Sequence, residues 1–334
     1  MTTTAGTTAG TTAGTTAGTA QSAVADRVLD GPHGDLRVRV YRPAGVPVAG
    51  LVWAHGGAFA HGDLDMPEAD GVARGLAAAG ITVVSVEYRL VSALDYRVPG
   101  ATPGTDGVRF PVPSEEVAFA FAWATGEGAA DLGVPAGRWS LGGASAGGDL
   151  AAGASLRLRD LATVSRRPAA VPLGLGSTGP DGATPVPTPR SVVLAYPVTH
   201  QELPEPTAEL AAKIAALPPE KNFPPGAVRA MNANYLGHDG PAASPYAFPG
   251  GADLRGLPPT LIVNSDHDAL RSGGEAYAAE LAAAGVDVLV VREDGTTHGH
   301  LNRPGEPGFA RSLARIAAWL TTDALVGTTH EPPR

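Results

Sequence analysis

The sequence predicts an α/β fold in which helices flank a mostly parallel central sheet. Short runs of β-branched and apolar residues recur along the chain, and helical segments separate them. Most of these runs are apolar throughout, which is typical of parallel strands that helices cover on both faces. Hydrophobic residues make up 43% of the 334 residues, so a sizeable core can form.

The expected elements alternate along the chain in a regular order. Residues 36–41 alternate between apolar and polar side chains, which predicts an antiparallel edge strand. Buried strands are expected at residues 50–54, 81–86, 138–141, 191–196, 260–264 and 286–291. Helices are expected at residues 66–79, 113–125, 146–159, 272–284 and 308–323.

The ends of the chain and its longest connections depart from this alternation. Residues 1–20 consist almost entirely of a Thr-Thr-Ala-Gly repeat, which cannot bury enough apolar surface to fold, so we expect a disordered tail. Residues 21–334 then form one α/β domain. We expect cap elements over the active site from residues 21–34, where a helical lid would involve residues 21–29, and from residues 199–256. The Pro- and Gly-rich residues 92–112 are expected near the mouth of the pocket.

Charge and composition exclude several classes of function. The formal net charge is −9 and no run of basic residues occurs, which argues against a nucleic-acid partner. No apolar run approaches the length of a membrane span, so no membrane insertion is expected. The chain has no cysteine, which excludes disulfides, thiolate metal sites and thiol nucleophiles. The N-terminus lacks the pattern of a secretory signal, so we expect a cytoplasmic location.

The strongest chemical signal is a serine in a glycine-rich turn. Ser145 lies in Gly143-Ala144-Ser145-Ala146-Gly147-Gly148, between an expected strand and an expected Ala-rich helix. A nucleophilic serine on such a strained turn needs small neighbours, because bulky ones would clash with adjacent strands. The helix that follows points its N-terminal amides toward developing negative charge. A plain strand-to-helix turn would carry a similar string, and the strand-turn-helix setting favours the nucleophile.

A second glycine-rich turn follows the strand that ends at Ala54. In His55-Gly56-Gly57-Ala58-Phe59, two adjacent glycines let the backbone approach a substrate closely. Acyl transfer needs backbone N–H groups that bind an oxyanion. An ordinary turn with a structural histidine explains this segment equally well when it is taken alone.

Two carboxylates and two histidines compete for the remaining roles of a catalytic triad. Asp266 and Asp268 both follow the strand at residues 260–264, and His298 and His300 both follow the last expected strand. The order serine, aspartate, histidine, each after a strand, is the order of α/β hydrolases. The residues by themselves do not choose between the members of each pair.

Together these segments resemble the bacterial hormone-sensitive-lipase-like esterases, over about residues 35–322. That family carries a His-Gly-Gly-Gly segment, a Gly-Asp-Ser-Ala-Gly-Gly segment, an Asp-Pro-Leu-Arg segment and a late His-Gly-Phe. The matching segments here are His55-Gly56-Gly57-Ala58, Gly143-Ala144-Ser145-Ala146-Gly147-Gly148, Asp268-Ala269-Leu270-Arg271 and His298-Gly299-His300. Val86-Glu87-Tyr88-Arg89-Leu90 and Phe110-Pro111-Val112-Pro113 match further family segments.

The resemblance implies an α/β-hydrolase fold with a cap and assigns the site. The triad is Ser145, Asp268 and His298, because Asp268 and His298 occupy the family positions. The oxyanion hole is formed by the N–H groups of Gly56, Gly57 and Ala146, and no metal or cofactor is required. This sequence departs from the family at Ala58, Ala144 and His300, and residues 92–109 look inserted.

The expected function is a serine esterase that hydrolyses short-chain acyl or aryl carboxylic esters through an acyl-enzyme. Phe59 and Tyr88 are candidate substrate-binding residues, whereas Trp53 and Tyr196 are expected to pack in the core. The expected partner is a small-molecule ester, and the resemblance allows a homodimer. An amidase, lactonase or acyltransferase with the same triad, or a non-catalytic ligand receptor, would share these features. A nucleotide-binding protein is disfavoured because the glycines lack the spacing and the lysine of phosphate-binding loops.

Overall fold

The computed structural model describes residues 22–96, 98, 107–165, 186–223 and 226–322. The expected disordered tail lies outside the described residues, as does part of the 92–112 connection. The strands are β1 (Ala23–Gly31), β2 (Gly34–Arg42), β3 (Ala49–Ala54), β4 (Ile81–Val86), β5 (Trp139–Ala144), β6 (Val192–Ala195), β7 (Thr260–His267) and β8 (Val288–Thr297). The helices are η1 (Pro67–Gly71), α1 (Val72–Ala78), α2 (Val112–Thr125), α3 (Ala129–Leu132), η2 (Ala136–Arg138), α4 (Ala146–Ser165), α5 (Ala208–Ala215), η3 (Pro219–Lys221), α6 (Ala227–Leu236), α7 (Arg271–Ala283), η4 (His300–Asn302) and α8 (Pro307–Thr321).

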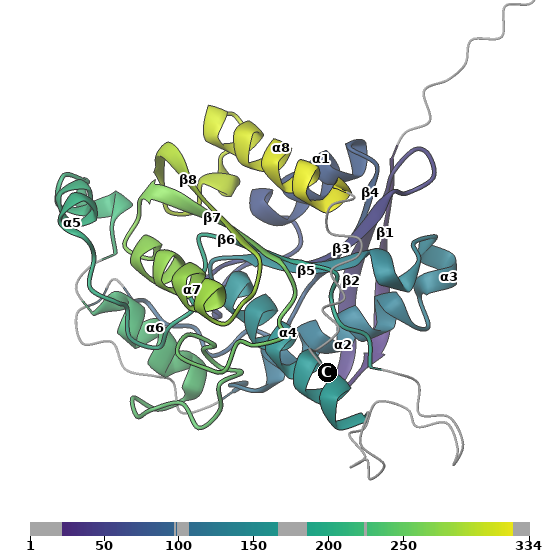
Figure 1. The fold of residues 1–334 in the computed structure, drawn as a ribbon, viewed down its shortest axis with the longest axis horizontal. Coiled ribbons are helices and arrows are strands. Elements are labelled where there is room, and N and C mark those ends of the chain that lie inside the picture. Colours follow the sequence, from purple (N-terminus) through teal and green to yellow (C-terminus); the bar gives the residue numbers. More distant parts are fainter. Residues whose placement is uncertain (1–21, 97, 99–106, 166–185, 224–225, 323–334) are drawn as a thin grey trace, which may run out of the picture.

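The eight described strands form one sheet in the order β1-β2-β4-β3-β5-β6-β7-β8 (Figure 1). β1 and β2 run antiparallel, β2 is antiparallel to β4, and all other neighbours are parallel. β3, β4, β5 and β6 are buried along their whole length, because helices cover both faces of the sheet. This is the mostly parallel α/β sheet that the sequence predicts.

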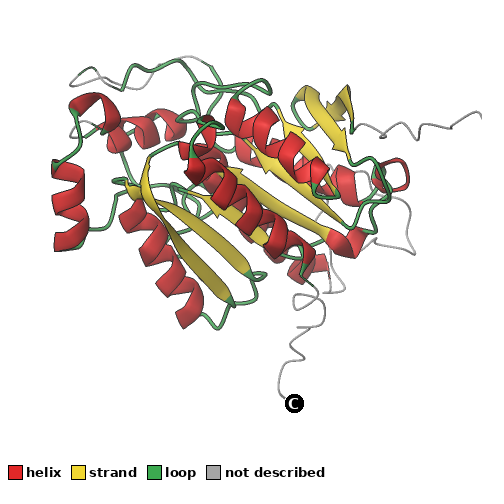
Figure 2. Ribbon diagram, turned by 90° about the horizontal axis from the view of Figure 1, so that it is seen from above, coloured by secondary structure: helices red, strands yellow, loops and turns green. Residues whose placement is uncertain are grey.

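Helices form a layer on each face of the sheet (Figures 1 and 2). α1 and α8 pack on one face, over a core that includes Trp53 and Tyr196. α2, α4 and α7 pack on the other face, over a core that includes Val52 and Leu141. α5 and α6 lie outside both layers, at the left of Figure 1.

The N-terminal segment differs from its expectation. Residues 23–31 form β1, which pairs along its length with β2, so a helix at residues 21–29 is wrong and β2 is not the edge strand. β1 lies at the end of the sheet, separated from β3 by β2 and β4, and does not cover the turn that carries Ser145. The tight hairpin at Gly31–Gly34 pairs the backbones directly, and only Leu29 of the strand is buried. The strand therefore leaves almost no hydrophobic pattern in the sequence.

Candidate active site

The turn that carries Ser145, the candidate nucleophile, connects β5 to α4 at the centre of the sheet. Ser145 has φ of 53°, in the left-handed region that side chains disfavour. Two glycines make room for this turn: a Cβ on Gly143 would lie 2.2 Å from the carbonyl oxygen of Gly147, and one on Gly147 would lie 2.2 Å from that of Ala54. The small residues around Ser145 are therefore a steric requirement, as the sequence predicts.

The structure brings Ser145, His298 and Asp268 into one chain of hydrogen bonds. Ser145 Oγ lies 3.0 Å from His298 Nε2, and His298 Nδ1 lies 2.7 Å from Asp268 Oδ2. Asp268 follows β7 and His298 follows β8, so parallel strands deliver both side chains to the same edge of the sheet. Asp268 is buried, and its Oδ1 also accepts the Leu270 N–H at 3.0 Å.

The environment of His298 favours its protonated form. Burial by itself lowers the pKa of this imidazole. The negative charge and hydrogen bond of Asp268 and the charge of Glu68 outweigh burial and the nearby Arg303, so the pKa of His298 is raised from its usual value. A histidine with a raised pKa, in contact with a hydroxyl, can accept the hydroxyl proton and hold the resulting charge.

The two competing residues are engaged elsewhere. His300 is fully buried, and its ring nitrogens lie 2.9 Å from Ser265 Oγ and 2.8 Å from Ser312 Oγ. Asp266 binds Lys213 Nζ at 2.5 Å and Arg271 Nη1 at 3.4 Å. Neither His300 nor Asp266 therefore takes part in the hydrogen-bond chain that reaches Ser145.

The expected oxyanion donors need one correction. The Gly56 N–H donates to Glu68 Oε1 at 2.6 Å, so this donor is not available to a substrate. Gly57 and Ala58 line the cavity beside Ser145 instead, and their N–H groups have no hydrogen-bond acceptor among the described residues. Ala146 is the first residue of α4, where N–H groups have no intrahelical acceptor. The Glu68 side chain that accepts the Gly56 N–H belongs to η1, so the pattern of the glycine turn by itself does not show that this N–H is already bound.

A cavity of about 350 Å³ opens beside Ser145 and His298. Its wall is partly apolar, with contributions from Phe59, Val198, Phe223, Met231 and Leu270. Two of these residues, Phe223 and Met231, come from the 199–256 region, so that region does contribute to the wall.

The two candidate substrate-binding aromatics have different places. Phe59 lines the cavity and stacks on Tyr235, with ring centroids 4.0 Å apart. Tyr88 is buried and does not line it; its hydroxyl donates to the His55 carbonyl oxygen at 2.8 Å. Tyr88 therefore supports the turn that carries Gly57. The expectation that its side chain lines the substrate pocket is not met. Trp53 and Tyr196 are fully buried in the core, as expected.

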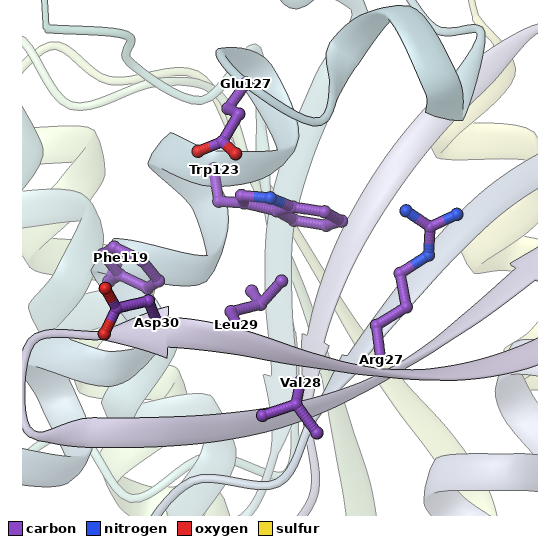
Figure 3. Close-up of a pocket in the computed structure, with 7 residues that line it drawn as sticks. All are labelled: Arg27, Val28, Leu29, Asp30, Phe119, Trp123 and Glu127. Atoms are coloured by element: carbon purple, nitrogen blue, oxygen red, sulfur yellow. The ribbon is translucent and has the colours of Figure 1, made fainter.

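Two further hollows lie on the described surface. One, of about 380 Å³, shares Tyr96, Phe223 and His298 with the cavity and has a more polar wall that includes Lys221 and Arg303. The other, of about 460 Å³, lies between β1 and α2, where Arg27 and Leu29 point toward Trp123 (Figure 3). It is larger but contains no residue of the hydrogen-bond chain, so we place the chemistry in the cavity beside Ser145.

Neither a candidate metal centre nor a membrane span is found in the part of the chain that the structure describes. These residues contain no cluster of three histidine, aspartate or glutamate side chains that could hold a metal ion. No helix among them is both long and apolar enough to cross a bilayer.

Comparisons with known proteins place the chain among the α/β hydrolases. The profile of the alpha/beta hydrolase fold family matches residues 51–302. Carboxylesterase NlhH of Mycobacterium tuberculosis is 31% identical over 276 residues, which cover 80% of this chain and 72% of that protein. Esterase LipI of the same species is 32% identical, over 84% of this chain and 76% of its own. An esterase from Pyrobaculum calidifontis superposes with a TM-score of 0.70 at 31% identity, covering 91% of this chain and 86% of its own.

Proposed function

The chain belongs to the hormone-sensitive-lipase-like esterases of the α/β-hydrolase fold, and we propose that Ser145, His298 and Asp268 are the catalytic triad of this carboxylic ester hydrolase. The observation that carries the proposal is the continuous hydrogen-bond chain from Asp268 through His298 to Ser145, at the wall of a cavity. Its substrates are small-molecule esters.

The proposed reaction has two acyl-transfer steps. Ser145 Oγ attacks the ester carbonyl carbon while its proton passes to His298 Nε2. The tetrahedral intermediate then expels the alcohol, which takes that proton from His298. Water attacks the acyl-enzyme in the same way, with His298 again accepting and returning a proton, and the carboxylic acid leaves. Asp268 orients the imidazole and stabilises its charged form.

Backbone amides hold the negative oxygen of each tetrahedral intermediate. We assign this role to the N–H groups of Gly57, Ala58 and Ala146. Gly57 and Ala58 have positive φ angles of 119° and 54°, which turn successive N–H groups in this loop. Ala146 contributes from the N-terminus of α4, where the helix dipole also favours negative charge.

The substrate class follows from the cavity wall. Apolar side chains such as Val198, Met231 and Leu270 favour an uncharged acyl group, and the cavity of about 350 Å³ favours a short or aryl one. A panel of p-nitrophenyl esters of rising chain length, with aryl esters beside it, measures this preference. The expected result is highest kcat/KM for short or aryl acyl groups and a decline for long chains.

A fluorophosphonate probe tests the nucleophile directly. The wild-type protein should be labelled on Ser145 and should hydrolyse p-nitrophenyl butyrate, whereas Ser145→Ala should do neither. Activity that survives in the purified Ser145→Ala variant contradicts the assignment, and a wild-type protein that does not react supports a non-catalytic ligand receptor. Parallel assays with amides, lactones and alcohol acceptors distinguish an esterase from an amidase, a lactonase and an acyltransferase. The cytoplasmic location and the homodimer stay predictions.

A further inference from the structure

A buried carboxylate that the triad does not include lies beside the active site. Glu68 comes from η1, is 1% exposed, and lines the same cavity as Ser145 and His298. Burying a carboxylate costs free energy because the charge loses its water. The contacts that offset this cost therefore indicate the role of Glu68 beside Ser145.

Both oxygens of Glu68 accept hydrogen bonds. Oε1 accepts the Gly56 N–H at 2.6 Å, and Oε2 accepts the Tyr196 hydroxyl at 2.7 Å. A donor on each oxygen is the pattern that an ionised carboxylate satisfies. The backbone of Glu68 is held as well, since its carbonyl oxygen accepts the indole N–H of Trp53 at 2.8 Å. The carboxylate is therefore held in place from both ends.

The first contact fixes the turn that binds the oxyanion. Gly56 lies between Glu68 and the nucleophile: a Cβ added to it would lie 2.5 Å from Glu68 Oε1 and 3.0 Å from Ser145 Cβ. Because the Gly56 N–H is bound by Glu68, the orientation of that peptide is set. The peptides of Gly57 and Ala58 follow directly, so their N–H groups depend on this anchor for their position.

The second contact reaches the catalytic base. The ring of Tyr196 packs against the imidazole of His298, with centroids 5.1 Å apart and an interplanar angle of 70°. Its φ is 36°, in the left-handed region, so the residue needs its contacts to stay there. The hydroxyl bond to Glu68 is one of those contacts, and it limits how far the ring beside His298 can move.

Charge provides a third link between Glu68 and His298. Two carboxylates, Asp268 and Glu68, raise the pKa of His298, while burial and the positive charge of Arg303 lower it. His298 becomes an imidazolium during each acyl-transfer step, so a second negative charge favours the transition state over the ground state.

We infer that Glu68 is a positioning residue of this active site, which anchors the oxyanion turn through Gly56, holds Tyr196 against His298, and stabilises the imidazolium. The inference rests on the proposed triad. Glu68 acts through these neighbours: its oxygens accept from Gly56 and Tyr196, and among the described residues no hydrogen bond joins it to Ser145 or His298.

Glu68→Gln separates charge from shape. The amide oxygen can still accept the Gly56 N–H, and the amide N–H can donate to Tyr196, so the framework stays while the charge is lost. We expect kcat to fall by about 10-fold, with KM nearly unchanged. The acid limb of the kcat/KM profile should move to lower pH, because the pKa of His298 falls when a negative charge is removed. A purely structural role would lower activity without moving this limb.

Two further variants separate the anchoring contacts. Glu68→Ala removes the acceptor of the Gly56 N–H, and we expect a loss in kcat on the order of 100-fold. Tyr196→Phe keeps the ring and removes only its bond to Oε2, so its loss should be smaller. Combined with Glu68→Ala, Tyr196→Phe should cost less than the sum of the single effects, because both variants remove the same bond. If Glu68→Ala does not fold, Glu68→Gln and Tyr196→Phe carry the test.

Glu116→Gln is the matched control. Glu116 is also fully buried, but it binds the Arg89 N–H at 2.7 Å and does not line the cavity. This variant should lower the melting temperature without moving the acid limb. The inference is overturned if folded Glu68→Gln keeps the wild-type kcat and pH profile, or if Glu116→Gln shifts the limb equally. A wild-type protein that neither hydrolyses esters nor reacts with fluorophosphonate instead refutes the proposed function.

Discussion

Two acid–histidine sets lie side by side at the ends of β7 and β8, and only one of them reaches Ser145. Asp268 and His298 bind each other, and the free nitrogen of His298 lies against Ser145. Asp266 and His300, each two residues away, do not bind each other and face other groups. The two sets have the same residue types and the same spacing, although His298 is partly exposed and His300 is fully buried.

The difference lies in what surrounds each imidazole. His298 has a carboxylate on one nitrogen, and its pKa is raised despite burial. His300 has a serine hydroxyl on each nitrogen and the positive charge of Arg303 nearby, so burial lowers its pKa to about 3. One ring is suited to carry a proton during a reaction, whereas the other stays neutral and serves packing. A histidine in this fold is therefore assigned by its partners rather than by its place in the sequence.

The sharpest test of this comparison replaces each histidine. His298→Asn should lower kcat on p-nitrophenyl butyrate by on the order of 10⁴-fold or more, because the general base is lost. His300→Asn should keep kcat within about tenfold of the wild-type value. It should cost roughly 1–3 kcal/mol of stability, because the buried hydroxyls of Ser265 and Ser312 lose their partner. Initial rates and thermal unfolding of both variants check this. Equal losses of kcat in the two variants would break the distinction between the rings.

The carboxylates give the next largest contrast. Asp268→Asn should lower kcat by on the order of 10³- to 10⁴-fold while the fold persists, because the imidazole loses its orientation and its counter-charge. Asp266→Asn should keep most activity but lose about 2–3 kcal/mol of stability, because Lys213 and Arg271 lose a buried partner. Steady-state kinetics beside urea unfolding separates the two effects. An inactive but stable Asp266→Asn variant would reverse the assignment.

The pKa of His298 is raised and that of His300 is lowered, so acid should reduce activity through His298 and stability through His300. Activity should fall on the acid side with a midpoint above 6.5, the ordinary value from which the pKa of His298 is raised. For His300 the unfolded chain gains a proton near pH 6.5, while the folded protein does so only near 3, so stability should fall as pH drops through this interval. A pH profile of kcat/KM measures the first effect, and urea midpoints measure the second. Both are recorded between about pH 4 and 8, the range in which histidine titrates.

The control for these profiles is again His300→Asn. It should flatten the acid-side loss of stability and leave the midpoint of the activity profile in place. An activity midpoint below 6.5 would mean that burial outweighs the carboxylates around His298.

The smallest expected effect concerns an acid that has no hydrogen-bond partner among the described residues. Asp149 is fully buried in the first turn of α4, and neither of its carboxyl oxygens has a hydrogen-bond partner among the described residues. Burial raises its pKa well above the usual value, so the folded protein loses stability as pH rises from about 3.8 toward that raised pKa. Relative to the wild-type protein, Asp149→Asn should therefore be more stable at about pH 8 than it is at about pH 5.

Urea unfolding of the wild-type protein and of Asp149→Asn at the two pH values measures that gain. If Asp149→Asn is destabilised equally at both pH values, the Asp149 carboxyl has a hydrogen-bond partner in solution. Burial of an unpaired carboxyl would then no longer explain its raised pKa.

Much of the scaffold could be predicted from local pattern. The strands at 50–54 and 81–86 and the helix at 113–125 are found within a residue or two of their expected bounds, because an apolar run buried on both faces leaves a strong signal. β1 could not be predicted, because a hairpin strand with one buried side chain is held by backbone bonds that any sequence can make. α6 was likewise hidden in the proline-rich 199–256 region.

The sequence by itself determined the α/β order, the glycine-rich turn that carries Ser145 and the two short segments that could supply an acid and a base. Only the tertiary structure decided which member of each pair faces Ser145, and that Gly56 donates to Glu68 rather than to a substrate. Residues two positions apart differ little in local pattern. Their roles depend on partners far along the chain, such as Lys213 for Asp266 and Ser312 for His300, and burial makes those partners selective because an unpaired polar group there is costly.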